Sequence, residues 1–182
     1  MAVAAQGALL HISPQRTAAH RQESTELMFL PSNKNVTEFR TQSVKHDGVE
    51  GETRTGHVAC LYDSTTMITH GGSSDKICSL DLRSKSWETL LIVSPKTNLS
   101  WARSALVGRN LYIFGGYDHQ NQSDQLYKFH IPSCTWQIIP QKGPCKRNSC
   151  CMEPLLFPNG SVKLVIFGGY DGLMTRGSLI LN

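Results

Sequence analysis

Long apolar runs are missing from this sequence. A membrane-spanning helix needs roughly 18 to 20 consecutive apolar residues, and no segment of the chain reaches that length. The first residues include a short patch rich in Ala and Leu, but Gln6 interrupts it and no basic residue precedes it, so the patch makes a poor secretory signal. We therefore expect no membrane association and a cytoplasmic protein. Four N-x-S/T acceptors leave secretion as a minor alternative, and they begin at Asn35, Asn98, Asn121 and Asn159.

Blocks of like charge are missing too. Charged residues make up 18% of the chain and the formal net charge is +4, with no cluster of Lys and Arg along the sequence. A nucleic-acid-binding protein usually concentrates its basic residues in a patch or run. Nucleic acid is therefore not an expected partner.

The sequence also lacks the common metal and catalytic motifs. No two cysteines stand in the C-x-x-C spacing that is typical of zinc sites, so we expect reduced thiols and no metal. Neither a G-x-S-x-G elbow, nor a phosphate-binding glycine loop, nor an H-E-x-x-H helix motif occurs. These absences predict a non-catalytic protein without a cofactor. The cysteines are Cys60, Cys78, Cys134, Cys145, Cys150 and Cys151.

A repeat is what the sequence does contain. The six residues IFGGYD occur at 113–118 and again at 166–171. Three double glycines, separated by 44 and 53 residues, lie at Gly71-Gly72, Gly115-Gly116 and Gly168-Gly169. A catalytic motif normally occurs once per site, whereas such duplication predicts a repeated structural unit.

Each unit reads as four short strands. One strand precedes the glycines, one ends at them, one is a Leu-rich run, and one carries a tryptophan, Trp87 or Trp136. No segment shows sustained helical periodicity. The runs that end at Gly115 and Gly168 are continuously apolar, which is typical of strands buried on both faces.

Four-stranded units at this period indicate a β-propeller. We expect the twin glycines to permit close approach of the backbone, and each tryptophan to pack against the next blade. An apolar run that ends in Gly-Gly, then a Leu-rich strand and a spaced Trp, resembles the kelch repeat. The resemblance implies an all-β fold, a partial kelch β-propeller of four-stranded antiparallel blades, with about three blades present. His70 departs from the apolar residue of the kelch pattern, so we expect looser packing there.

The organisation along the chain follows from this alignment. Residues 1–25 read as a disordered leader, and residues 26–50 as the last two strands of a preceding blade, placed at 27–32 and 36–39, followed by a loop. The kelch units cover about 54–92, 100–140 and 147–182, the last one stopping in its third strand. We expect the C-terminal part of a longer propeller, or a shortened product, whose open blade edges favour self-association.

The kelch resemblance implies a scaffold or adaptor that binds another protein through loops on one face. Arginines in such loops suit an acidic or C-terminal segment of the partner, and Tyr and Trp often dominate binding energy. The predicted partner-binding residues are Arg54, His57, Asp75, Trp101, Arg103, Tyr117, Asp118, His119, Arg147, Tyr170 and Asp171.

Alternatives remain at several of these positions. The three arginines are equally suited to brace loops, and Tyr117 and Tyr170 to pack against neighbouring blades. His57, whose counterparts by counting are Trp101 and Cys150, is often structural in the family.

Other kelch proteins give alternative functions. One is the substrate receptor of a ubiquitin ligase, although residues 1–50 show no BTB, F-box or BC-box region. Another is a kelch segment attached to an enzyme of the copper oxidase or tRNA-modifying methyltransferase type, although the histidines and tyrosines show no ligand spacing.

Overall fold

The computed structural model describes residues 8–10, 24–29, 40–45, 54–72, 74–91, 99–141, 146–172 and 178–181. Side chains are described in 54–72, 74–90, 99–141 and 146–172. Within these ranges the structure contains fourteen strands and no helix. The prediction of an all-β protein is confirmed.

The N-terminal sheet has three strands in the order β1-β2-β3, all antiparallel. They are β1 (Ala8–Leu10), β2 (Ser24–Phe29) and β3 (Arg40–Lys45). Two predictions need correction here. Strand β1 lies inside the expected leader, whose other residues up to 23 are outside the described ranges, and β3 begins after the predicted strand at 36–39. The analogy with the tryptophan strand placed β3 too early, because the connection from β2 is longer than in the later units.

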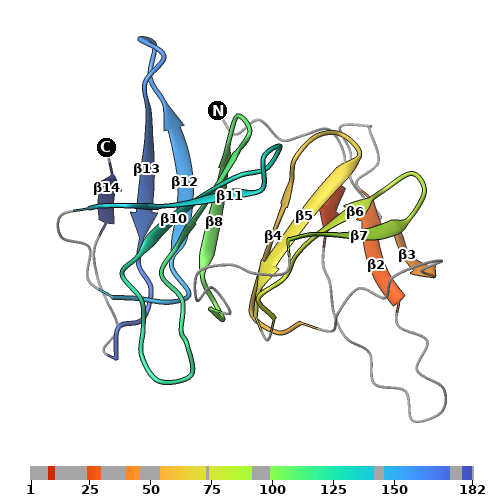
Figure 1. The fold of residues 1–182 in the computed structure, drawn as a ribbon, viewed down its shortest axis with the longest axis horizontal. Coiled ribbons are helices and arrows are strands. Elements are labelled where there is room, and N and C mark those ends of the chain that lie inside the picture. Colours follow the sequence, from red (N-terminus) through yellow and green to blue (C-terminus); the bar gives the residue numbers. More distant parts are fainter. Residues whose placement is uncertain are drawn as a thin grey trace.

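Two complete blades follow. Blade 1 has the order β4-β5-β6-β7 and blade 2 the order β8-β9-β10-β11 (Figure 1). Blade 1 comprises β4 (His57–Leu61), β5 (Thr66–Gly71), β6 (Ile77–Asp81) and β7 (Ser86–Leu91). Blade 2 comprises β8 (Arg103–Val107), β9 (Asn110–Phe114), β10 (Leu126–His130) and β11 (Thr135–Ile139).

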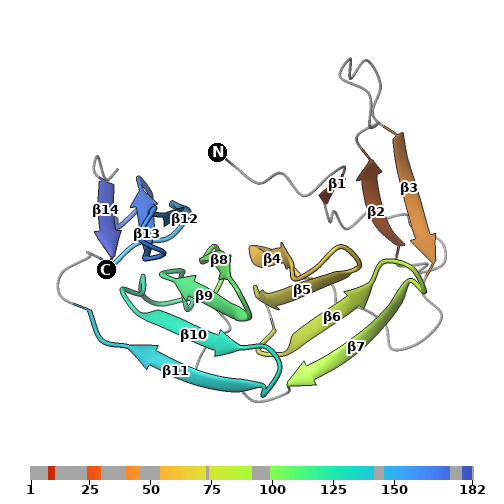
Figure 2. The same ribbon diagram turned by 90° about the horizontal axis from the view of Figure 1, so that it is seen from above.

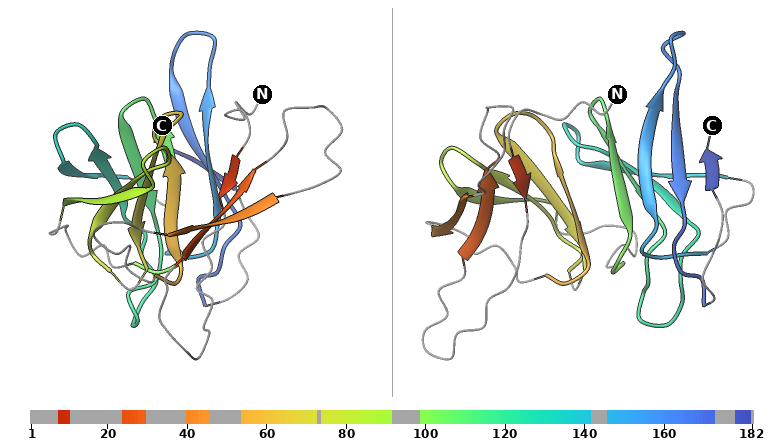
Figure 3. Two further views of the ribbon diagram at one scale, coloured as in Figure 1. Left: turned by 90° about the vertical axis from the view of Figure 1, so that its right-hand side faces the viewer. Right: turned by 180° about the vertical axis from the view of Figure 1, so that it is seen from behind.

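Blade 3 has three described strands in the order β12-β13-β14. They are β12 (Cys151–Leu156), β13 (Val162–Phe167) and β14 (Ser178–Leu181). The hairpin of β12 and β13 extends past the ends of the neighbouring sheets (Figure 3). The sequence predicted a third strand near the end of the chain, and β14 occupies that place.

The sheets stand side by side in an arc, as propeller blades do (Figure 2). The first strands of blades 1 and 2, β4 and β8, lie on the inside of the arc, and the tryptophan strands β7 and β11 lie on the outside. Strand β8 contacts both β4 and β12. The predicted partial propeller of four-stranded antiparallel blades is therefore confirmed.

Alternation along β9 explains why its last four residues, 111–114, are all apolar. Leu111 and Ile113 belong to the core between blades 1 and 2. Phe114 belongs to the core between blades 2 and 3, and Tyr112 packs against that core. Successive strand residues point to opposite faces, so a strand between two neighbours needs apolar residues at every position.

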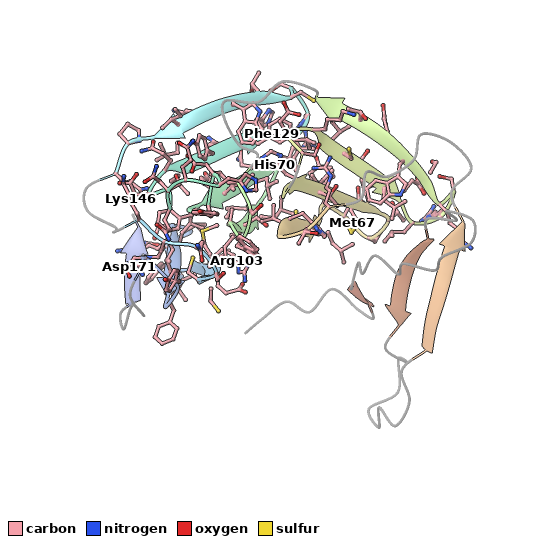
Figure 4. All side chains as sticks on the ribbon, turned by 90° about the horizontal axis from the view of Figure 1, so that it is seen from below. Met67, His70, Arg103, Phe129, Lys146 and Asp171 are labelled. Carbon is pink, nitrogen blue, oxygen red and sulfur yellow. The ribbon has the colours of Figure 1, made fainter. Side chains whose placement is uncertain are left out.

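His70 fills the position where the kelch pattern has an apolar residue. It is 1% exposed, and its ring lies 5.3 Å from that of Trp136, centroid to centroid. Figure 4 shows His70 close to Phe129 between the two blades, and Trp136 also packs on Phe129 at 4.8 Å. Looser packing was therefore a wrong expectation, because an aromatic ring fills this position. Trp136 packs against the preceding blade, not the following one.

Candidate functional site

The segments that open the blades occupy equivalent positions, which the strand register defines. The residue before each double glycine is His70, Phe114 or Phe167, and it pairs with Val58, Arg103 or Cys151, respectively. Two residues before each of these strand partners lie Gly56, Trp101 and Ser149. His57 is therefore equivalent to Ala102 and Cys150. Counting along the sequence wrongly gave Trp101, because the connections between blades differ in length.

The three opening positions share an unusual backbone conformation. Gly56, Trp101 and Ser149 have φ of 71°, 57° and 54°. The left-handed region suits glycine and costs other L-residues roughly 1–2 kcal/mol. A bulky tryptophan at such a position is uncommon, and strained residues of this kind concentrate at functional sites.

Backbone hydrogen bonds between blades hold the opening segments in a row. The Trp101 N–H donates to the Gly56 carbonyl at 2.6 Å, and the Ser149 N–H donates to the Trp101 carbonyl at 2.8 Å. The double glycines also participate, since the Gly116 N–H donates to the Arg147 carbonyl at 2.9 Å. A Cβ on Gly116 would lie 2.8 Å from the Leu99 Cβ, so this close approach excludes any side chain.

Trp101 begins a row of three aromatic rings at the surface, of which the first and last are exposed and the middle one, Tyr117, is half-buried. Its side chain is 43% exposed and lies across Gly56, where an added Cβ would be 3.1 Å from the indole Nε1. The Tyr117 ring is 6.3 Å from Trp101, and the His119 ring is 6.1 Å from Tyr117. Tyr117 is fixed by two backbone hydrogen bonds with Ser100, of 2.9 and 2.8 Å. Three of the predicted partner-binding residues are thus brought together.

Arg103 is the half-buried arginine of this region. It begins β8 and lies on the concave side of the arc (Figure 4). One guanidinium nitrogen donates to the carbonyl of the preceding residue, Ala102, at 3.1 Å. Burial raises the pKa of the nearby Cys150 thiol, while the charges of Arg103 and Arg147 oppose that rise. Arg103 therefore places a positive charge on the inner side of blade 2.

Arg54 and Arg147 are buried, with 7% and 4% exposure. Arg54 Nη1 donates to the Lys76 carbonyl at 2.8 Å and to the Gly71 carbonyl at 3.3 Å. Arg147 Nη1 donates to the Gly168 carbonyl at 3.0 Å. The two arginines hold the first glycine of their own blades in the same way. They are placed to brace the fold, and we assign neither of them to the partner surface.

The remaining predicted residues are more scattered. His57 is half-buried, and burial lowers its pKa although a hydrogen bond with the Arg54 backbone favours the charged ring. The Asp118 carboxylate accepts hydrogen bonds from the backbone N–H groups of Gln120 and Asn121, which shapes the loop that carries His119. Of the others, Asp75 is exposed, Tyr170 is 47% exposed and Asp171 is half-buried.

Neither a metal site nor a membrane helix is found in the described parts of the chain. No group of three His, Cys, Asp or Glu residues there is arranged to hold a metal ion. Likewise, no helix of the described residues is long and apolar enough to cross a membrane.

Comparison with known proteins decides the family. The profile described as the KLHDC2/KLHL20/DRC7 Kelch-repeats domain matches residues 15–182. The chain belongs to the kelch-repeat family. Kelch repeats are in general protein-interaction modules, so the exposed row at the blade openings lies on a module of that kind.

Two relatives support this assignment. Over 98 residues the kelch chain is 30% identical to human "Kelch domain-containing protein 3", a match that covers 50% of this chain and 26% of that protein. Over 134 residues it is 23% identical to "Acyl-CoA-binding domain-containing protein 4" of Arabidopsis thaliana, covering 69% of this chain and 20% of that protein. The matched part thus spans about a quarter and a fifth of these relatives.

Sequence reasoning missed how the kelch openings are built. It did not single out Gly56 and Ser149, nor the left-handed backbone that they share with Trp101. The signal that could have revealed it is a glycine directly before His57, at the position that the strand register makes equivalent to Trp101. That equivalence depends on strand pairing, which counting along the sequence did not reproduce.

Proposed function

We propose that this chain is a non-catalytic scaffold or adaptor that binds an acidic or C-terminal segment of another protein at the blade openings. The proposed surface consists of Trp101, Arg103, Tyr117, Asp118 and His119. The observation that carries the proposal is Trp101, an exposed indole held in a strained conformation beside Tyr117.

The chemistry of this surface suits an anionic peptide. Exposed aromatic rings supply contact area at low cost in side-chain entropy, and Trp, Tyr and Arg are the residue types that most often dominate binding. The half-buried Arg103 offers a guanidinium, which pairs with a carboxylate through two parallel hydrogen bonds. A partner whose chain ends in a free carboxylate beside an apolar residue would use both features.

The test measures binding of the purified chain to an immobilised peptide that has an acidic C-terminal segment, in parallel with the same peptide amidated at its C-terminus. Amidation and Arg103→Ala are both expected to weaken binding, with an unchanged melting temperature for the variant. Arg109→Ala is the matched control, because Arg109 is an exposed arginine in the turn between β8 and β9.

Two outcomes would count against the proposal. Equal binding of the two peptides by wild type and Arg103→Ala would remove the carboxylate as the recognised group. Loss of binding together with a lower melting temperature would assign Arg103 to the fold. The ubiquitin-ligase receptor and the enzyme-attached segment stay predictions, because no described residue favours either one.

A further inference from the structure

An asparagine followed directly by glycine lies at the tip of the β12–β13 hairpin. Residues 157–160 form a β-turn, in which the Gly160 N–H donates to the Phe157 carbonyl at 2.9 Å. Proline at the second position and glycine at the fourth are favoured in such turns, and Gly160 has φ of 80°, which suits glycine. Both Asn159 and Gly160 are exposed, so water reaches this turn.

This hairpin is longer than its counterpart in blade 2. Cys151 and Phe167 pair although they are 16 residues apart, and the equivalent pair, Arg103 and Phe114, is 11 residues apart. The five added residues carry the turn past the ends of the neighbouring sheets (Figure 3). The turn lies at the far end of β12 from the blade openings, so it is separate from the proposed partner surface.

Ser161 fixes the side chain of Asn159. The Ser161 backbone N–H donates to Asn159 Oδ1 at 3.0 Å, and the Ser161 hydroxyl donates to the same oxygen at 2.7 Å. A backbone N–H can only donate, so its partner is the amide oxygen and not the amide nitrogen. The carbonyl group of this side chain therefore receives two hydrogen bonds from one residue.

Two donors on a carbonyl oxygen favour the addition of a nucleophile to its carbon. The oxygen then becomes an oxyanion, and hydrogen bonds to an ionised oxygen are roughly twice as strong as neutral ones. The backbone nitrogen of Gly160 is the nucleophile that follows along the chain, and its attack on Asn159 Cγ closes a five-membered ring. A Cβ built on Gly160 would meet nothing within 4 Å, so this ring has room to form.

We propose that Asn159 is a site of spontaneous deamidation, for which the chain itself supplies the nucleophile and the oxyanion donors. The Gly160 nitrogen bonds to Asn159 Cγ and loses its proton, the bond from Cγ to Nδ2 breaks, and the amide nitrogen leaves with that proton as ammonia. Water then opens the resulting succinimide at either carbonyl and gives aspartate or isoaspartate. The product carries a new negative charge at the hairpin tip, and isoaspartate also adds a methylene to the main chain.

One hydrogen bond opposes the reaction. The Gly160 N–H must leave the Phe157 carbonyl before its nitrogen attacks, and an exposed hydrogen bond of this kind slows the step by roughly 2- to 10-fold. The two bonds from Ser161 act in the other direction and join neighbouring residues, so they do not depend on the closed turn.

The following residue distinguishes Asn159 from the other described asparagines. Each of those is followed by a residue with a side chain, which crowds the attacking nitrogen, whereas glycine has no Cβ. They are Asn110, Asn121 and Asn148. We therefore expect deamidation to be fastest at Asn159.

The test is peptide-mapping mass spectrometry of the purified chain during incubation at pH 8, with circular dichroism to verify folding. Loss of the Asn159 amide is expected to be at least about 10-fold faster than loss at any other described asparagine, with isoaspartate among the products. Ser161→Ala keeps the N–H donor and removes the hydroxyl, so it should slow the reaction roughly 2- to 10-fold. Ser123→Ala is the matched control. Ser123 stands in the same place after Asn121, so this variant should leave the rate at Asn159 unchanged.

Unfolding in urea separates the effect of the hairpin from that of the local sequence. In urea, wild type and Ser161→Ala should lose the Asn159 amide at equal rates, because the hairpin no longer orients the hydroxyl. An Asn159 that stays intact in the folded chain, while the unfolded chain reacts, would overturn the proposal and show that the turn protects this residue. Equal rates for the two folded chains, or the same difference in urea, would overturn the role of Ser161 as a donor.

Discussion

Replacing Phe114 and Phe167 by alanine, one at a time, gives a matched pair of substitutions with different expected costs. The two side chains are chemically identical and belong to identical six-residue motifs. They differ in exposure, 0% against 62%, because blade 3 covers the first and no described residues cover the second. We expect the free energy of unfolding to fall much more for Phe114→Ala than for Phe167→Ala.

The magnitudes follow from burial. Truncation of a fully buried phenylalanine removes its transfer free energy and leaves a cavity, at a cost of about 3–5 kcal/mol. Full burial of a phenylalanine contributes roughly 1.5–3 kcal/mol, and somewhat less than half of the Phe167 side chain is covered. Solvent fills the space that it vacates. Phe167→Ala should therefore cost about 1 kcal/mol or less.

Urea denaturation, followed by circular dichroism and tryptophan fluorescence, measures both values. The slope of the unfolding free energy with denaturant should not change if only stability changes. All variants are measured at one protein concentration, since any association would add stability that depends on concentration. Equal costs for the two variants would refute the reasoning, because burial by blade 3 would then not control the energetics of this motif.

Three further expectations concern other parts of the molecule. Trp136→Ala should cost about 3 kcal/mol of unfolding free energy, the lower end of the range for a core aromatic, because its partly buried indole packs between blades 1 and 2. Trp101→Gly should stay within about 1 kcal/mol, because relief of the left-handed strain offsets lost contacts. Equal losses in thermal unfolding would contradict both expectations. Burial raises the pKa of Cys60 to about 12, so its thiol should react slowly. Mass spectrometry after brief iodoacetamide treatment at pH 8 should find Cys60 unmodified and the exposed Cys151 labelled. Early labelling of Cys60 in the folded chain would be inconsistent with its burial. Burial lowers the pKa of His57 below 6.5, so the unfolded state takes up the proton first as the pH drops. The free energy of unfolding should therefore fall as the pH drops through 6.5 towards the pKa of His57 in the folded state. A His57→Asn variant should lack this pH-dependent component, and a pH profile identical to that of the wild type would rule out this role of His57.

The repeat made much of the fold predictable. The double glycines, the apolar runs that end at them and the spaced tryptophans are local signals, so the strands of blades 1 and 2 could be found from their order and character. The N-terminal sheet was harder, because its third strand has no tryptophan to mark it. Strand β1 was not predicted, because it lies in the segment interpreted as a leader and its pairing with β2 depends on residues far away in the sequence.

The candidate site was only partly predictable, because loops of unequal length obscured the register. Exposure separates Trp101 and the half-buried Arg103 from the buried Arg54 and Arg147. No local sequence pattern distinguishes an arginine that is buried on the glycine carbonyl of its own blade from one that stays half exposed. Strand pairing shows that Trp101 is the structural equivalent of Gly56. Counting residues along the sequence did not find this equivalence.

The sequence by itself determined the repeat and the kelch resemblance, since both depend on residue types at regular spacing. It also determined that strands such as β9 are buried on two faces, because the four residues 111–114 that lead to the double glycine are all apolar. Only the tertiary structure decided which copy of a motif is covered. Phe114 and Phe167 have the same neighbours along the chain, but burial depends on what packs across the face of a sheet, and that contact is made by another blade.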